Sequence, residues 1–367
     1  MKYYVTGKEK LFIKVEPSLR DSIDYFGRTP LMYCVLADRL NTAKYLIRQG
    51  AQVSCVDNHG RSAVHIAAHK GAIKFLQLLA EKGANFSLPD KEGQTPLHLA
   101  TNRRNQDGAC VRYILKKIEP NYIDARNHQG QSALHCAAYF ANVEAVRLLT
   151  KSNANPDLGD INGKTPLHFS ASNCQANAAK TVDLLLTLGS STLINWQDYE
   201  GRTALHTAIK EANKLVADLL ITRNADVKLA DNKSRTALHW AAQLGRVEFI
   251  KTLLDGKVDA QALDSNGATP LHYAAAAGTT TSHCSTIAIL LDHGVSVDIQ
   301  DETGSTPLIW ASSKGASNAI VKLIESGAEI QQSNHTGNTA LHGASTAGKS
   351  LAVEILISRG ADCESEK

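Results

Sequence analysis

The sequence has 367 residues, with 39 lysines and arginines against 36 aspartates and glutamates, a formal net charge of +3. This near balance gives no reason to expect a nucleic-acid partner. No apolar run reaches the roughly 20 residues that a membrane-spanning helix needs. The charged stretch from Met1 to Lys14 does not resemble a signal peptide. We therefore expect a cytoplasmic protein that is not integral to a membrane.

The seven cysteines contain no Cys-x-x-Cys pair, and their number is odd. Cys34 and Cys136 each stand in a segment where a small buried side chain is expected. Reduced, structural thiols in the cytosol are therefore the expected state of these residues.

The N-terminal segment, residues 1–23, stands outside the pattern that follows it. Leu11, Ile13 and Val15 alternate with other residues before Pro17. This alternation is typical of a short extended segment, but a degenerate first cap would look the same. We expect residues 1–23 to form an N-terminal extension or cap, residues 24–362 a single repeat domain, and residues 363–367 a tail.

A tetrapeptide that begins with Thr or Ser recurs ten times, from Thr29-Pro30-Leu31-Met32 to Thr339-Ala340-Leu341-His342. Its copies begin at positions 29, 62, 95, 132, 165, 203, 236, 269, 306 and 339. Each copy follows a polar turn and opens a helix, because a hydroxyl caps the helix start and Pro is tolerated in the first turn. After a break, Val247, Ile250 and Leu254 show the apolar spacing of a second helix.

A Thr-Pro-Leu-His tetrapeptide at a period of about 33 residues is similar to the signature of ankyrin repeats. This resemblance implies an all-α solenoid of about ten helix-turn-helix units with projecting turns like those of a β-hairpin. In such a solenoid the first helices and the turn tips build a concave wall.

Three units are longer than the others, and we place the additional residues in loops between the two helices, near 102–109, 173–178 and 279–285. Two interpretations stay open for these loops: recognition of a partner, or insertions that a surface turn tolerates. The final helix, at 351–358, is strongly apolar, which indicates either an array that continues or an end that docks a partner.

Eight of the fourteen histidines end a tetrapeptide and therefore lie about one repeat apart, not around one point. We expect these histidines to bond neighbouring turns, and we expect no metal site and no cofactor. No nucleophile, metalloprotease or phosphate-loop motif is visible in the sequence. The sequence therefore predicts a protein that is not an enzyme and has no catalytic residues.

Partner specificity is expected to lie in residues that differ between repeats and face the concave groove, most densely in repeats one to seven. Aromatic and arginine side chains dominate binding hot spots. The cationic character of the set favours an acidic or phosphorylated partner segment, although exposed lysines and arginines also simply solvate a surface. The predicted groove residues are Tyr25, Phe26, Arg28, His59, Arg61, His69, Lys70, Lys91, Arg103, Tyr139, Phe140, Lys164, Tyr199, Arg202, Lys233 and Arg235.

Four stretches are more specific than the repeat consensus: from Phe26 to Leu40, from Leu193 to Thr203, from Arg235 to Gly245 and from Gly267 to Ala275. They resemble the N-terminal array of the inversin family of ciliary scaffolds. The resemblance implies protein partners, namely a NIMA-related kinase and an ankyrin- and SAM-domain protein. It also implies a role in Wnt and planar-polarity signalling at a primary cilium or apical cortex. The alternative is a generic ankyrin adaptor, or a cytosolic part of a larger signalling or membrane protein.

Overall fold

The computed structural model describes residues 19–102, 107–256 and 258–362. Contacts within the chain divide it into two compact units, residues 1–193 and 194–367, and each is described by itself. The predicted extension therefore lies outside the described residues up to position 18, and the predicted tail lies outside them entirely. In residues 19–23, Asp21 accepts a hydrogen bond from the amide of Gln52 at 2.9 Å.

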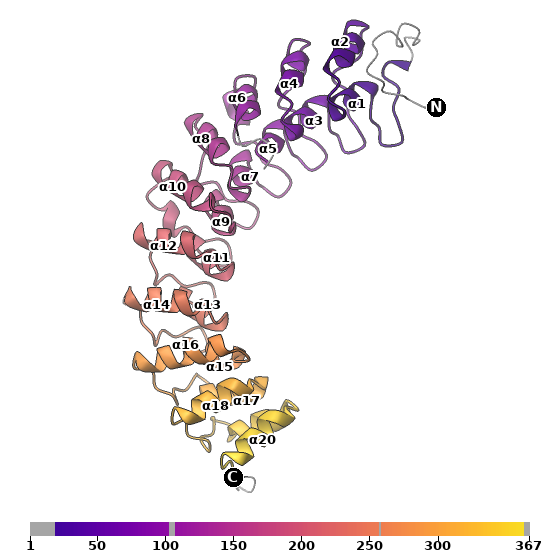
Figure 1. The fold of residues 1–367 in the computed structure, drawn as a ribbon. Helices are drawn as coiled ribbons and strands as arrows, with labels where there is room; N and C mark the ends of the chain where they lie inside the picture. Colours follow the sequence, from indigo (N-terminus) through magenta and orange to yellow (C-terminus); the bar gives the residue numbers. More distant parts are fainter. Residues whose placement is uncertain (1–18, 103–106, 257, 363–367) are drawn as a thin grey trace. The chain divides into compact units, whose positions relative to one another are not determined.

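The described residues of the first unit form five helix pairs (Figure 1). Their bounds are α1 (Pro30–Leu36), α2 (Leu40–Arg48), α3 (Ala63–Lys70), α4 (Ile73–Ala80), α5 (Pro96–Ala100), α6 (Ala109–Leu115), α7 (Ala133–Tyr139), α8 (Val143–Lys151), α9 (Pro166–Ala171) and α10 (Ala178–Leu188), with a 3-10 turn η3 (Pro120–Tyr122). A second 3-10 turn, η4 (Leu193–Asn195), spans the division in the sequence.

Five helix pairs are also present in the part of the second unit that the structure describes. Their bounds are α11 (Ala204–Lys210), α12 (Lys214–Thr222), α13 (Ala237–Gln243), α14 (Val247–Asp255), α15 (Pro270–Ala277), α16 (Thr281–Asp292), α17 (Pro307–Lys314), α18 (Ser317–Glu325), α19 (Ala340–Thr346) and α20 (Ser350–Ser358). The predicted all-α repeat architecture is confirmed, and extended structure in the described residues is limited to isolated bridges at two turns, Val56 with Ser62 and Ala230 with Thr236.

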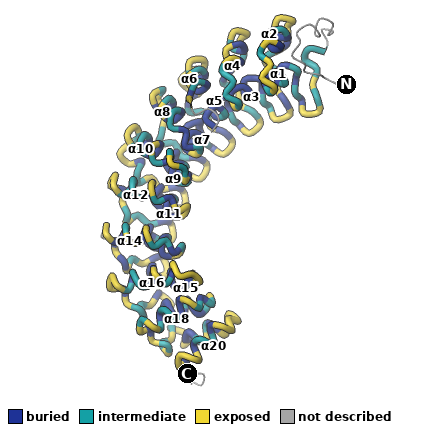
Figure 2. Tube along the Cα trace, viewed as in Figure 1, coloured by how far each residue is buried: buried dark blue, intermediate teal, exposed yellow. Residues whose placement is uncertain are grey.

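Within each unit the helices form two layers. Successive odd-numbered helices contact one another, and successive even-numbered helices do the same. The core lies between the layers (Figure 2), where paired alanines such as Ala67 and Ala68 let odd helices approach closely while Leu76 and Leu79 fill the space behind them. At the last pair, Leu351 and Ile357 of α20 are about half exposed.

The tetrapeptide histidine joins two repeats. In α3, the His65 Nδ1 accepts the amide of Ser62 at 3.1 Å and lies 2.9 Å from the Ser62 hydroxyl. Because Nδ1 accepts, the proton is on Nε2, which donates to the Gln94 carbonyl of the next repeat at 3.2 Å. His98, His135, His239 and His272 make the corresponding bond to the following repeat. The predicted structural role is confirmed for these five.

The projecting turns are held by their first residue and by one another. The Asp57 Oδ1 accepts the amides of His59 and Arg61, both at 2.9 Å. The Lys91 amide then donates to the His59 carbonyl at 2.8 Å, which ties one turn tip to the next. Gly60, with φ +77°, permits this approach, because a Cβ atom there would lie 2.9 Å from the Lys91 nitrogen.

One projecting turn lacks this glycine. Ser234 holds φ +57° at the position that glycine occupies in the other nine copies. An L-residue pays a steric penalty in this region. We expect Ser234→Gly to raise the free energy of unfolding by about 0.5–1 kcal/mol, measured by urea denaturation.

The matched control is Gly201→Ser at the preceding turn of the same unit. Its new Cβ would lie 2.6 Å from the Asn232 Oδ1 and 2.7 Å from the Asn232 nitrogen, so it should destabilise the fold. A lower urea midpoint for Ser234→Gly would contradict the assignment of strain to this turn.

The buried histidines make stability depend on pH. Burial lowers the pKa of His135 and His206 to about 4, and it lowers the pKa of His65 and His239 as well. The folded protein then binds fewer protons than the unfolded chain between about pH 6.5 and pH 4. Stability is fully present above pH 6.5 and falls as the pH falls through that window, by up to about 1.4 kcal/mol per pH unit for each histidine.

Urea midpoints at pH 7.5 and pH 5.5 test this dependence. The midpoint should be lower at pH 5.5, and the difference should shrink in His135→Gln, which loses one of the titrating groups. Equal midpoints at the two pH values would show that these histidines are not held neutral by the fold.

Candidate partner-binding site

The odd helices and the projecting turns place the predicted groove residues in three kinds of position. Turn tips carry Tyr25, Phe26, His59, Lys91, Tyr199 and Lys233. The position before the tetrapeptide holds Arg28, Arg61, Lys164, Arg202 and Arg235. The ends of odd helices carry His69, Lys70, Tyr139 and Phe140. Arg103 lies outside the described residues. The predicted residues from 199 onward belong to the second unit, and the others belong to the first.

The turn tips present accessible rings and charges. Tyr25 is 90% exposed and Tyr199 73% exposed. The Arg28 guanidinium lies 5.0 Å from the centre of the Phe26 ring, which is a cation–π contact. Lys91 and Lys233 are exposed at their tips. These side chains are available to a partner without rearrangement of the fold.

Three of the predicted arginines pair with their own turns. Arg61 donates from Nε to the Asp57 Oδ2 at 3.0 Å and from Nη2 at 2.8 Å. Arg202 and Arg235 bind Asp198 and Asp231 in the same way. Positive charge for an acidic partner therefore rests mainly on the exposed lysines.

These arginines also change the titration of their partners. Burial alone would raise the pKa of Asp57, but the hydrogen bonds from the Arg61 side chain and the turn amides lower it below its ordinary value. The same balance lowers the pKa of Asp231 beside Arg235. Both carboxylates therefore stay ionised at neutral pH and hold their arginines in place.

In the longer repeats, residues that follow an odd helix form hydrogen bonds to carbonyls at the ends of odd helices. Asn102 donates from Nδ2 to the His69 carbonyl at 2.8 Å and to the Leu99 carbonyl at 2.9 Å. Asn173 reaches the Tyr139 carbonyl at 2.5 Å. Each bond supplies a donor to a carbonyl at the end of a preceding odd helix, where the helix itself offers none.

The prediction of a loop near 279–285 is wrong in part, because α16 already begins at Thr281. The Thr280 hydroxyl lies 2.7 Å from the His283 Nδ1, the same pairing that starts the odd helices. The His283 Nε2 then donates to the Gln243 carbonyl at 3.2 Å. This second Thr-x-x-His cap lengthens the helix and reduces the loop.

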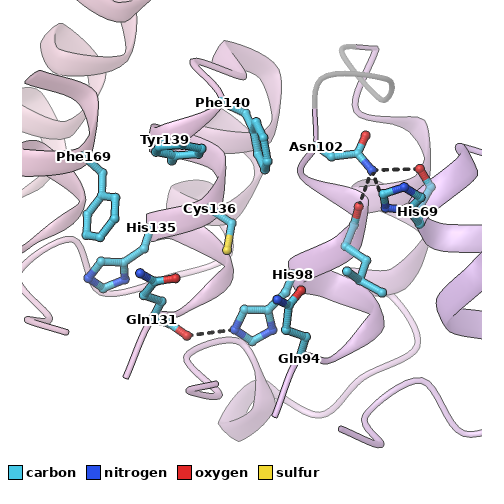
Figure 3. Close-up of a pocket in the computed structure, with 11 residues that line it drawn as sticks. His69, Gln94, His98, Asn102, Gln131, His135, Cys136, Tyr139, Phe140 and Phe169 are labelled. Carbon is cyan, nitrogen blue, oxygen red and sulfur yellow. Dashed lines mark hydrogen bonds between the residues drawn. The ribbon is translucent and has the colours of Figure 1, made fainter. Parts of the chain in front are cut away.

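A hollow of about 380 Å³ lies on the odd-helix layer of the first unit, between α3, α5, α7 and α9 (Figure 3). It brings together three predicted residues, His69, Tyr139 and Phe140. Asn102 lies at its rim and bonds His69. The other lining residues, which sequence reasoning did not select, are Gln94, His98, Leu99, Gln131, His135, Cys136 and Phe169.

The missed residues had a signal in the sequence. Leu99, Cys136 and Phe169 each directly follow the tetrapeptide, and this position varies more than the tetrapeptide itself. Figure 3 shows Phe169 and Tyr139 on one side of the hollow and Asn102 and His69 on the other. The Tyr139 ring lies 5.2 Å from Phe140 and 6.4 Å from Phe169, both edge-on. The rim is therefore aromatic.

In the second unit the position after the tetrapeptide carries rings that were also missed. Trp240 and Trp310 donate from their indole nitrogens to Asp231 at 3.1 Å and to Asp301 at 2.8 Å. Tyr273 donates its hydroxyl proton to the Asp264 Oδ2 at 2.7 Å. The odd-helix (inner) layer of repeats seven to nine is therefore lined with half-buried rings, whereas the sequence analysis expected the groove residues most densely in repeats one to seven.

The described residues contain no group of three or more His, Cys, Asp or Glu side chains that could hold a metal ion. In the part of the chain that the structure describes, every helix is too short or too polar to cross a bilayer. The arrangement presents side chains for binding along both units, and its histidines and carboxylates are engaged in holding turns.

The family model described as ankyrin repeats (3 copies) matches residues 8–90, 83–160, 152–231, 212–301 and 275–367, which together cover most of the chain. Inversin from Homo sapiens is 40% identical over 204 residues, 55% of this chain and 19% of that protein. Inversin from Danio rerio is 42% identical over 206 residues, 56% of this chain and 20% of that protein. The matched region thus spans about a fifth of each inversin.

Two further similarities are more distant. The B-cell lymphoma 3 protein homolog of Mus musculus is 30% identical over 202 residues, 54% of this chain and 36% of that protein. The solved human ASB11 ankyrin repeat domain superposes with a TM-score of 0.53 at 24% identity, over 63% of this chain and 99% of that chain. The latter supports the fold alone.

The hydrogen bonds from aromatic rings of the odd-helix layer to the turn carboxylates should stabilise the fold. Tyr273→Phe removes the only proton that Tyr273 can donate to the buried Asp264 carboxylate, and we expect the free energy of unfolding to fall by about 1–2 kcal/mol. Burial and this hydrogen bond also raise the pKa of Tyr273 well above its ordinary value. Urea denaturation measures the loss.

Tyr199→Phe is the matched control, because the Tyr199 ring is exposed at a turn tip of the same unit. It should leave the urea midpoint unchanged. Equal stability of Tyr273→Phe and the unmodified protein would show that the Asp264 bond contributes nothing to the inner layer.

Proposed function

This chain belongs to the ankyrin-repeat family, and from that premise we propose that it is a non-enzymatic scaffold whose odd-helix layer and turn tips bind protein partners. The observation that carries the proposal is the partly open, aromatic-rimmed hollow on the odd-helix layer of the first unit, in which a projecting turn carries the exposed Lys91. Aromatic anchors in a pocket with charged residues at the rim are the usual anatomy of a protein–protein binding surface.

The similarity to inversin supports a narrower proposal. The partners would be a NIMA-related kinase, which the scaffold positions or activates, and an ankyrin- and SAM-domain protein. The setting would be a signalling complex in the cytoplasm, at a primary cilium or apical cortex, with a bearing on Wnt signalling. The match to the human protein covers 55% of this chain at 40% identity, which is the similarity that supports this narrower proposal.

Within this proposal, the predicted groove residues divide by role. The exposed Lys91 and the half-buried Lys164 supply positive charge on projecting turns of the first unit, and Tyr139 and Phe140 supply the aromatic rim of the hollow. Arg61 instead holds Asp57, so its replacement would disturb the turn as well as any partner. A charge-reversal test therefore uses the lysines rather than that arginine.

The test measures binding of a purified NIMA-related kinase to the full chain by biolayer interferometry. We expect Lys91→Glu combined with Lys164→Glu to weaken the complex at least tenfold, because the partner segment is acidic or phosphorylated. Lys74→Glu combined with Lys151→Glu carries the same change of charge on exposed positions of the even helices α4 and α8, and should leave the affinity within twofold.

Equal weakening by the two pairs would show that only net charge matters and that the odd-helix layer is not the binding surface. Failure of the intact chain to bind the kinase would favour a generic ankyrin adaptor, the alternative that the sequence leaves open.

A further inference from the structure

We propose that the hollow between α3, α5, α7 and α9 receives one aromatic side chain of a partner polypeptide, in the place that this chain's own rings occupy in other repeats. The inference rests on the proposed scaffold function and specifies the chemistry of its partner. It follows from comparing one position, the residue directly after the tetrapeptide, in successive repeats.

In three of the five repeats of the second unit, those of Trp240, Tyr273 and Trp310, the ring at this position packs against the tetrapeptide histidine of the preceding repeat. Thr207 and Gly343 hold the position in the other two repeats. The centre of the Tyr273 ring lies 5.5 Å from that of His239, at 90° between the planes. The Trp310 ring lies 5.3 Å from His272. Edge-to-face pairs at this separation are favourable beyond the area that they bury.

In the first unit, one ring beside the hollow packs against a tetrapeptide histidine in the same way. The Phe169 ring lies 5.5 Å from His135 at 87°. One repeat earlier, the corresponding ring would stand at Cys136 and would pack against His98. The sequence places a small thiol there, and Leu99 precedes it by one repeat. The hollow therefore occupies the space that an aromatic ring of the odd-helix layer would fill. This part of the chain supplies no such ring.

The chemistry of the walls suits an aromatic guest. Burial raises the pKa of the Cys136 thiol to about 12, so it stays protonated and acts as a small apolar surface. Tyr139, Phe140 and Phe169 surround the opening with rings (Figure 3). Tyr139 is 53% exposed although its ring also contacts Phe140 and Phe169, so its remaining face is open to a guest.

Polar groups at the floor can pair with a phenol or an indole. In the second unit, the ring donates to a turn aspartate nine residues earlier. At Cys136 the residue nine positions earlier is Asn127, whose Oδ1 already accepts the Gln129 and Gln131 amides. Gln94 and Gln131 line the hollow instead. The Gln94 amide oxygen can accept a proton from the guest, whereas the Gln131 Oε1 already accepts one hydrogen bond from the Asn127 Nδ2 at 3.4 Å and has one further lone pair.

The size of the hollow also limits the guest. At about 380 Å³ it lies near the lower end of the range for ligand pockets, about 300–1,000 Å³. It holds a single ring with the start of its backbone rather than a bulky ligand. A partner would insert one residue here and lay the rest of its segment along the turn tips.

The direct test uses N-acetyl-L-tryptophanamide as the probe and N-acetyl-L-leucinamide as the non-aromatic match, titrated into the full chain and followed by NMR chemical shifts. The tryptophan probe should bind with a Kd on the order of 0.1–1 mM, as expected for a ligand of its size. Its shifts should centre on Cys136 and Tyr139, and the leucine probe should bind at least fivefold more weakly.

Two substitutions at one residue make the test specific. Cys136→Trp places a ring in the hollow and should abolish binding of the tryptophan probe, whereas Cys136→Ala leaves the hollow open and should not weaken it. Because a large residue can also disturb folding, Tyr139→Ala combined with Phe140→Ala serves as a second route. It removes the rim and should weaken the probe at least fivefold. Circular dichroism and a urea midpoint confirm that each variant is folded.

Equal binding of the two probes, or unchanged tryptophan binding in Cys136→Trp, would overturn the inference. These readouts do not involve the kinase, so the inference is tested even if the kinase fails to bind. Where the kinase does bind, Cys136→Trp should weaken it at least tenfold relative to Cys136→Ala. An equal affinity of the two variants for the kinase would show that the hollow is not part of the surface that binds the kinase.

Discussion

The structure depends on an imidazole that is bonded at both nitrogens and recurs in five of the described repeats. In α3 the His65 Nδ1 closes the helix start and the Nε2 reaches the carbonyl of Gln94, one repeat further on. This requires a neutral ring with its proton on Nε2, and burial keeps the ring neutral by lowering its pKa. Each repeat is thus completed by its successor, as expected for a solenoid in which only neighbours interact.

The same constraint explains where the surface is free to vary. The turn carboxylates, the tip-to-tip backbone bonds and the histidines hold the backbone, so the residue after the tetrapeptide can change without moving it. Trp310 at this position fills the inner layer and bonds Asp301, whereas Cys136 leaves a hollow. The two sites also differ in the turn residue nine positions earlier, which is Asp301 for Trp310 and Asn127 for Cys136.

The sequence was sufficient to predict the fold because the tetrapeptide, its spacing and its histidines report local bonds that recur in most of the repeats. It was less informative about the site. Tyr139 and Phe140 could be selected as aromatic residues near a helix end, but the hollow beside them arises from a missing ring at Cys136. An unfilled space of this kind can be recognised only in the folded protein, where neighbouring repeats are stacked. Likewise, the spacing of Arg61 from Asp57 was visible, but not that the turn folds them into an ion pair.

The longer repeats show how the array accepts added residues without losing its register. Asn102 in the first unit and His283 in the second both donate to a carbonyl at the end of the odd helix of the preceding repeat. Such carbonyls have no partner inside their own helix. Added residues are therefore anchored where they enter, and only the segment beyond the anchor is free to differ. Anchoring and recognition are for this reason compatible roles of one loop, and the position of Asn102 at the rim of the hollow brings the two together.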